Sequence, residues 1–89
     1  MRPFKINSTN AIHDFLHEVY CRSGKIFDPA KDLKTLQNKN GTLVFSKEEG
    51  EYLDNVMTEC FIYCVHNNLN IYRIVHGVGL QLSRTRAVA

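Results

Sequence analysis

The sequence predicts a mainly α-helical protein, a compact bundle of three to four helices in a single domain over residues 1–89. Apolar residues recur at spacings of three and four in separate segments, and good N-capping residues precede those segments. The 89 residues are 44% hydrophobic and 22% charged, which is typical of globular proteins. A chain of this length forms one domain with a small core. Residues 85–89 are predicted to form a frayed tail.

The first predicted helix runs from Asn7 to Ser23. Ser, Thr and Asn at positions 8–10 all make good N-caps. The apolar residues that follow at helical spacing are Ile12, Phe15, Leu16, Val19 and Tyr20. Gly24 ends the helix, because glycine readily adopts the left-handed conformation of a C-cap.

A short second helix is predicted from Asp28 to about Gln37. Asp28 is a good cap, and Pro29 fits the first helical position, where its missing N–H has no helical partner to lose. A turn then follows at 38–41. The β-prone residues 42–45 leave two alternatives open. They form either a two-stranded ribbon with residues 3–6, which a helix would have to cover, or an extended entry to the next helix.

The central helix is predicted from Ser46 to Val65. Ser46 followed three residues later by Glu49 is the pattern of a capping box. Acidic residues crowd the first turns, where the helix dipole favours negative charge. The apolar stripe contains Leu53, Val56, Met57, Cys60, Phe61 and Cys64. Ile62 lies nearly opposite the centre of this stripe, so the helix is predicted to pack on two sides or to meet another chain.

The last helix is predicted to begin after a turn at 66–70, with Asn70 as its cap. Helical spacing is shared by Ile71, Ile74, Val75 and Val78. Gly77 and Gly79 each cost about 1 kcal/mol relative to alanine inside a helix, so the helix is predicted to end near one of them.

The net charge of +2 is too mild to imply a polyanionic partner, but it is unevenly distributed. Residues 46–66 carry one lysine and five carboxylates, whereas residues 67–89 carry three arginines and no carboxylate. No apolar run follows the basic N-terminus, so a secretory signal and a membrane span are not expected. Three cysteines, an odd number, argue against a disulfide framework, and a reducing cytoplasm is predicted.

The sequence favours a non-enzymatic protein-interaction or regulatory module that acts through a homodimer or a protein partner. Aromatic and branched apolar residues exceed what one small core needs, and such residues are enriched at interface centres. The predicted interface residues are Tyr52, Phe61, Ile62, Tyr63 and Tyr72. No catalytic pair, nucleophile elbow or phosphate-binding loop is present in the sequence. Small size and simple organisation favour a microbial source or a mobile element.

A DNA-binding regulator is the first alternative. Segment 60–78 loosely resembles a helix-turn-helix motif, with two helices around a short turn. The residues that would face nucleic acid are Tyr72, Arg73, His76, Arg84 and Arg86. Gly77 stands where the motif has a branched apolar residue, and the preceding helix is acidic, so it would repel phosphate.

A zinc-binding protein is the second alternative. His13, His17 and Cys21 recur every four residues on the first helix, and histidines at this spacing bind Zn²⁺ in known sites. Three ligands on one straight helix do not easily complete a tetrahedron. The candidates for a fourth ligand are Cys60, Cys64, His66 and His76. Apart from zinc, no cofactor is expected.

Overall fold

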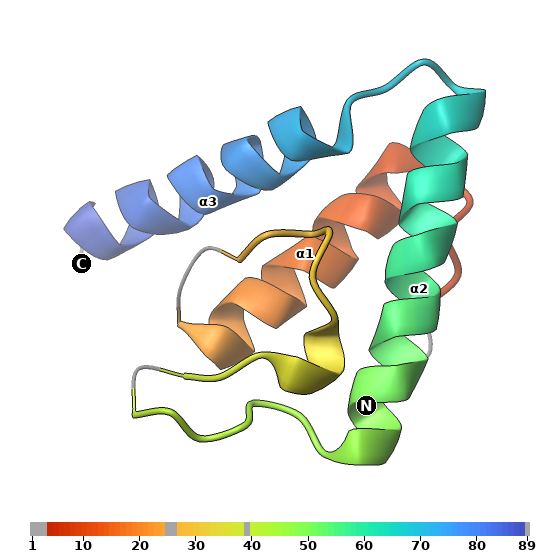
Figure 1. The fold of residues 1–89 in the computed structure, drawn as a ribbon. Helices are drawn as coiled ribbons and strands as arrows, with labels where there is room; N and C mark the ends of the chain where they lie inside the picture. Colours follow the sequence, from red (N-terminus) through yellow and green to blue (C-terminus); the bar gives the residue numbers. More distant parts are fainter. Residues whose placement is uncertain (1–3, 25–26, 39, 89) are drawn as a thin grey trace.

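The computed structural model describes the backbone of residues 4–24, 27–38 and 40–88, with side chains described as far as residue 81. Three α-helices and one 3₁₀ helix follow one another in this part of the chain (Figure 1). They are α1 (Thr9–Ser23), η1 (Leu33–Thr35), α2 (Lys47–His66) and α3 (Ile71–Val88). The predicted mainly α fold is confirmed as a three-helix globule without strands among the described residues.

The caps predicted for the first helix are present. The Ser8 side chain accepts a hydrogen bond from the Ala11 N–H at 3.2 Å, which satisfies one of the free donors of the first turn. At the other end, Gly24 has a φ of 72°, and its N–H donates to the Tyr20 carbonyl at 2.8 Å. Local sequence therefore sets both ends of α1.

The central helix also begins and ends close to the predicted residues. The Ser46 hydroxyl accepts from the Glu49 N–H at 3.2 Å, as expected of an N-cap. Asn67 follows the last turn, and its side-chain amide donates to the Tyr63 carbonyl at 2.9 Å. Asn68 then takes a positive φ of 56°, which turns the chain toward α3.

The helix predicted over 28–37 is wrong: the segment forms turns and only one short 3₁₀ helix, η1. The Asp28 carboxylate accepts from the Ala30 N–H at 2.9 Å, which makes a tight turn instead of a helix cap. The Leu33 N–H donates to the carboxylate of Asp54 on α2. Because a long-range partner takes this donor, the helical ladder does not form through the segment.

The predicted ribbon between residues 3–6 and 42–45 is not found among the described residues; Pro3 lies outside them. Leu43 instead makes an isolated antiparallel bridge with Gln37, and the Val44 N–H donates to the Leu36 carbonyl at 2.9 Å. The Gly41 N–H donates to the Asn38 carbonyl at 3.0 Å between these two segments, and closing so short a loop costs less entropy than a distant pairing. Val44 and Phe45 lie in a bend before α2, so the alternative of an extended entry to the next helix is not confirmed for these two residues.

The prediction that the last helix ends near its glycines is also wrong, since α3 continues through both of them to Val88. Ile71, Val75 and Val78 are all buried on one face of α3. Their packing offsets the unfavourable helix propensity of glycine. The fraying of residues 85–89 stays a prediction, with Ala89 outside the described residues.

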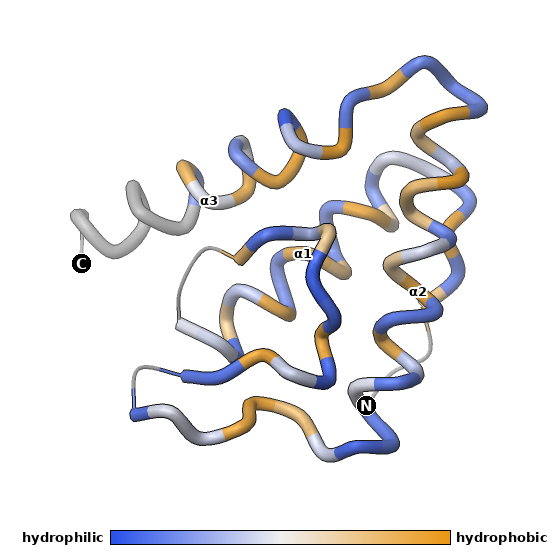
Figure 2. The backbone as a smooth tube through the Cα atoms, in the orientation of Figure 1, coloured by the Kyte–Doolittle hydropathy of each residue, from blue (hydrophilic) through white to orange (hydrophobic). Residues whose placement is uncertain are grey.

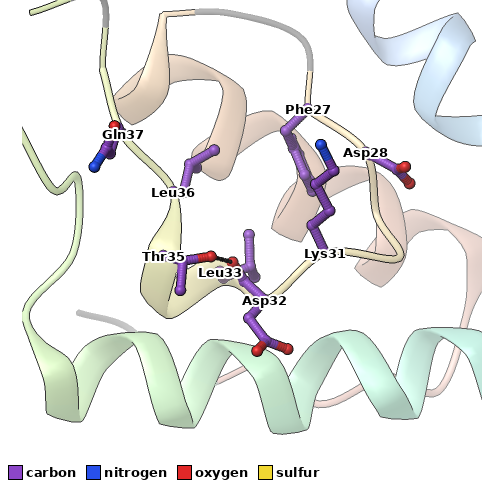
Figure 3. A pocket seen from close by; sticks show the side chains of 8 residues that line it. All are labelled: Phe27, Asp28, Lys31, Asp32, Leu33, Thr35, Leu36 and Gln37. Atoms are coloured by element: carbon purple, nitrogen blue, oxygen red, sulfur yellow. Dashed lines mark hydrogen bonds between the residues drawn. The ribbon is translucent and has the colours of Figure 1, made fainter. Parts of the chain in front are cut away.

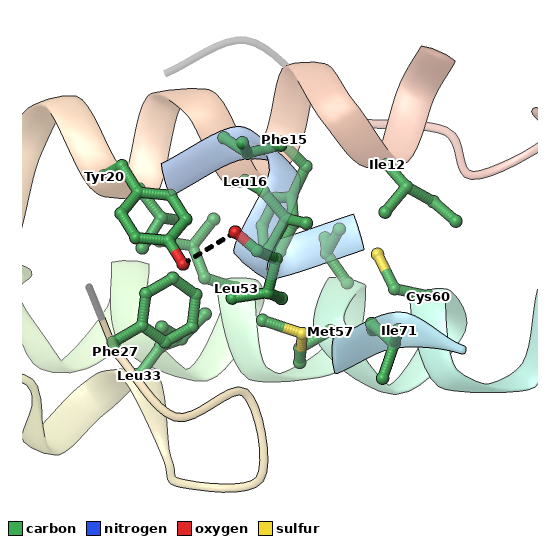
Figure 4. Packing of buried hydrophobic residues seen from close by; sticks show 14 of the residues in the cluster. Ile12, Phe15, Leu16, Tyr20, Phe27, Leu33, Leu53, Met57, Cys60 and Ile71 are labelled. Carbon is green, nitrogen blue, oxygen red and sulfur yellow. Dashed lines mark hydrogen bonds between the residues drawn. The ribbon is translucent and has the colours of Figure 1, made fainter. Parts of the chain in front are cut away.

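The core lies where α1, α2, α3 and the segment around η1 meet (Figure 4). Its buried residues are Ile12, Phe15, Leu16, Val19, Tyr20, Phe27, Leu33, Phe45, Leu53, Val56, Met57, Cys60, Cys64, Ile71, Val75 and Val78. The Tyr20 hydroxyl donates to the Val75 carbonyl at 3.2 Å and so joins α1 to α3. Burial raises the pKa of Tyr20 from 10.0 to about 12, which keeps this donor protonated.

The N-terminal end of α2 is held closely against two neighbours. Gly50 is buried, and a Cβ at this position would overlap the backbone of Lys34 in η1, so only glycine fits. Arg22 from the end of α1 reaches Glu49 at 3.1 Å and lies 4.9 Å from the centre of the Phe45 ring. The pKa of Glu49 is lowered, mainly by the hydrogen bond from Arg22.

Candidate interaction surface

Exposed apolar side chains gather where α2 ends and α3 begins. Ile62 is 52% exposed, Val65 73%, Leu69 38% and Tyr72 51%. We call these four residues, together with the half-buried Phe61, the α2–α3 apolar surface. Hydrophobic residues dominate the C-terminal half of α2, whereas the N-terminal half is mostly hydrophilic (Figure 2).

Helical geometry and one ring contact make this surface continuous. Val65 lies one turn beyond both Phe61 and Ile62, so the three side chains share one side of α2. The Phe61 ring meets the Tyr72 ring edge-on, with centroids 6.4 Å apart, which connects α2 to α3. The Leu69 N–H donates to the Cys64 carbonyl at 2.8 Å, which places Leu69 in the turn between them.

Two residues of the predicted interface make contacts within the folded chain. The Tyr52 hydroxyl accepts from the Phe4 N–H at 2.8 Å, so this tyrosine fixes the N-terminal segment on α2. Tyr63 is half-buried and packs against the core. It lines a shallow hollow of about 370 Å³ together with Ile6, Glu59, Ile62, His66 and Asn67. Conversely, Leu69 was not predicted, because a leucine in a turn has no helical periodicity to mark it.

The residues proposed to face DNA lie on α3. Tyr72, Arg73 and His76 are exposed in its first two turns. Arg84 and Arg86 fall on the part of α3 whose side chains lie outside the described residues. α3 packs mainly on α1 and only slightly on α2, whereas in a helix-turn-helix the two helices on either side of the turn support each other. DNA binding stays a prediction.

Of the three predicted metal ligands, the structure brings two together. His17 and Cys21 are exposed, and the Cys21 Sγ lies 3.6 Å from the His17 Nδ1. His13 is half-buried one turn earlier. Within the part of the chain that the structure describes, no three His, Cys, Asp or Glu side chains group closely enough to hold a metal ion. Of the three predicted ligands, the structure therefore brings only His17 and Cys21 together.

The other cysteines lie in the core. Burial raises the pKa of Cys60 from 9.0 to about 12, and it also raises that of Cys64. Burial in the core shields both thiols from solvent and disfavours the thiolate, which is the form that acts as a nucleophile or a metal ligand. Cys60 and Cys64 therefore act as small apolar residues of α2.

A cavity of about 300 Å³ lies within the loop that contains η1 (Figure 3). It is lined by Phe27, Asp28, Lys31, Asp32, Leu33, Thr35, Leu36 and Gln37. Its polar groups support the loop itself: Asp28 accepts from the Ala30 N–H, and the Thr35 hydroxyl donates to the Asp32 carbonyl at 2.8 Å. Its lining brings together no nucleophile with a base.

No helix in the described part of the chain is long and apolar enough to cross a membrane. Comparisons with protein-family models, with curated proteins and with solved structures found no match for this chain.

Proposed function

We propose that this protein is a small interaction module that binds a partner protein through the α2–α3 apolar surface. The proposal rests on the exposure of Ile62 and Val65, two branched apolar side chains on one side of α2. Full burial of such a side chain contributes about 1.5–3 kcal/mol, and neither residue belongs to the core that the described residues form. Contiguous apolar surface of this kind marks protein interaction sites in soluble domains.

Charge next to the α3 side of the surface indicates the chemistry of the partner. Arg73 and His76 are exposed on α3 beside Tyr72. From residue 67 to the end, the sequence has three arginines and no carboxylate. We therefore expect a protein segment in which Asp or Glu residues flank apolar side chains, because complementary charge speeds encounter and fixes register. A second copy of this chain is the competing occupant.

Site-specific photo-cross-linking in the native host tests the proposal. One variant carries a photo-reactive amino acid in place of Val65, and the control carries it in place of Glu48, which is exposed on the first turn of the same helix. We expect an adduct from position 65 alone, and the cross-linked peptide should contain carboxylates next to apolar residues. An adduct of twice the chain mass would show that the occupant is a second copy. Identical adducts from both positions, or none, would overturn the surface.

Substitution of Ile62 separates loss of binding from loss of folding. Ile62→Lys places a charge on the surface, one turn before Val65, and should abolish the adduct from position 65. Because the side chain is half exposed, the thermal unfolding temperature should change little. Ile62→Val keeps the apolar contact and should keep the adduct. Retention of the adduct in Ile62→Lys contradicts the proposal.

A further inference from the structure

A hollow lies beside the α2–α3 apolar surface, between α2 and the N-terminal segment. Ile6 forms one wall, and the C-terminal half of α2 forms the other. The hydrogen bond from the Phe4 N–H to the Tyr52 hydroxyl holds the segment alongside α2 (Figure 1). Ile62 lines the hollow and also belongs to the apolar surface, so a partner that covers this side chain reaches the hollow as well.

Glu59 gives the hollow a negative charge that the fold does not use. Its side chain is exposed, and no ion pair or hydrogen bond joins its carboxylate to another described residue. Residues 48–66 contain five carboxylates and no lysine or arginine. Lys5 is exposed in the N-terminal segment and is not part of the lining. His66 lies seven residues beyond Glu59, about 10 Å along the helix axis, so the carboxylate dominates its own end of the hollow.

The rest of the lining suits a side chain with an apolar stem and a cationic end. Ile6 and Ile62 offer apolar contacts to methylene groups, along which long cationic side chains lie with their charge in water. Tyr63 is half-buried one turn beyond Glu59, and a tyrosine ring stacks on a planar guanidinium. Arginine also donates two parallel hydrogen bonds to a carboxylate, and it is enriched at interfaces, whereas lysine is depleted there. The hollow therefore favours arginine over lysine.

We propose that the hollow binds an arginine side chain of the partner protein, with the guanidinium on Glu59 and the methylene groups between Ile6 and Ile62. This inference rests on the proposed function, because the arginine belongs to the segment that covers the α2–α3 apolar surface. The surface then lies between opposite charges, with Arg73 and His76 on the α3 side and Glu59 on the other. A segment with arginine at one end and Asp or Glu at the other binds in a single direction, because the reverse direction places like charges together.

Binding of a single amino-acid probe tests the hollow by itself. The probe is N-acetyl-arginine amide, and its matched control is N-acetyl-citrulline amide, which has a similar shape without the charge. In ¹H–¹⁵N correlation spectra of the full chain, we expect saturable shifts at Ile62 and Tyr63 with millimolar affinity for the arginine probe, as is usual for a ligand with few atoms. The affinity should fall about fivefold in Glu59→Gln and for the citrulline probe. Glu51→Gln, which removes a charge from another exposed position of α2, should bind like the wild type. Equal affinity for the two probes, or in the two variants, would overturn the proposal.

The photo-cross-link from position 65 then separates the hollow from the apolar surface. Glu59→Gln should lower the yield of the adduct about fivefold at limiting partner, and Glu51→Gln should leave the yield unchanged. The cross-linked peptide should contain an arginine on one side of its apolar residues and Asp or Glu on the other. An adduct whose yield stays the same in Glu59→Gln, or whose peptide lacks arginine, contradicts the arginine site and leaves the proposed function standing. Saturable binding of the arginine probe without an adduct from position 65 would instead support the arginine site and contradict the proposed function.

Discussion

The two halves of α2 present different chemistry to solvent. The exposed residues of the first half, 47–56, are Lys47, Glu48, Glu51, Tyr52 and Asn55. In the second half, 57–66, the branched apolar side chains of Ile62 and Val65 are exposed beside Thr58, Glu59 and His66. The first half is packed tightly against η1 at Gly50 and joined to α1 by the Arg22–Glu49 ion pair, whereas the second half has little contact with α3.

This difference separates the demands of folding from those of binding. A polar outer face and a buried inner face are what the stability of a helix in a small domain requires. Exposed Ile62 and Val65 contribute little to that stability, because their side chains remain in contact with water. The apolar residues at the second half of α2 therefore indicate a role outside the fold itself.

Alanine substitution in the two halves should give the largest contrast. Leu53 is 1% exposed, so Leu53→Ala removes core packing and should lower the free energy of unfolding by about 2–5 kcal/mol. Val65→Ala, at a residue 73% exposed, should change it by less than about 0.5 kcal/mol. Urea denaturation followed by circular dichroism measures both. A large loss of stability in Val65→Ala would mean that Val65 is covered within the folded chain and would remove the contrast between the halves.

The glycines of α2 and α3 give the next contrast. Alanine at Gly50 would overlap the Lys34 backbone, and we expect a net loss of about 1–2 kcal/mol after the gain in helix propensity. Nothing lies within 4 Å of a Cβ placed at Gly77, so Gly77→Ala should stabilise α3 by up to about 1 kcal/mol. Thermal unfolding should therefore move in opposite directions for the two variants. A shift in the same direction contradicts the close packing of η1 on α2.

The parts of the fold that depend on neighbouring residues were predictable from sequence. Ser8 and Ser46 cap helices through bonds to residues three positions away, and the apolar spacing marks the buried faces of α1 and α2. The failures involve distant partners. The Leu33 N–H bonds to Asp54, 21 residues away, and this replaces the predicted helix with η1. α3 continues past Gly77 because Val78 is buried in the core that α1 and α2 help to form.

The candidate surface was only partly predictable for the same reason. Helical geometry places Ile62 opposite the buried stripe of α2, and it is indeed exposed. Tyr52 was predicted at the interface, yet its hydroxyl bonds to the Phe4 backbone, 48 residues away in sequence. Helical periodicity within α2 contains no information about where the N-terminal segment lies. Leu69 is exposed although it was not predicted at the interface. It lies in a turn, where no helical repeat marks an exposed position.

The caps at the two ends of α2 should differ by a smaller amount. Ser46→Ala removes the acceptor of the Glu49 N–H and should cost about 1 kcal/mol. Asn67→Ala removes an exposed hydrogen bond to the Tyr63 carbonyl. Water can take the place of the lost donor, so the free energy of unfolding should fall by less than about 0.5 kcal/mol. Urea denaturation at neutral pH gives both values. Equal losses of stability would show that the caps at the two ends of α2 contribute equally to the stability of the fold.

The smallest effect concerns the Arg22–Glu49 ion pair at the first half of α2. The hydrogen bond from Arg22 lowers the pKa of Glu49 below its ordinary value of 4.5, so the folded state binds the proton less readily than the unfolded chain. The ion pair therefore stabilises the fold fully above pH 4.5 and loses this contribution as the pH falls through the lowered pKa. Glu49→Gln should be slightly less stable than the wild type at pH 7 in low salt, and the difference should disappear at acidic pH and shrink in high salt. If the difference persisted in acid, the contribution of Glu49 to stability would come from its hydrogen bonds alone. The first half of α2 would then be joined to α1 by packing and not by charge.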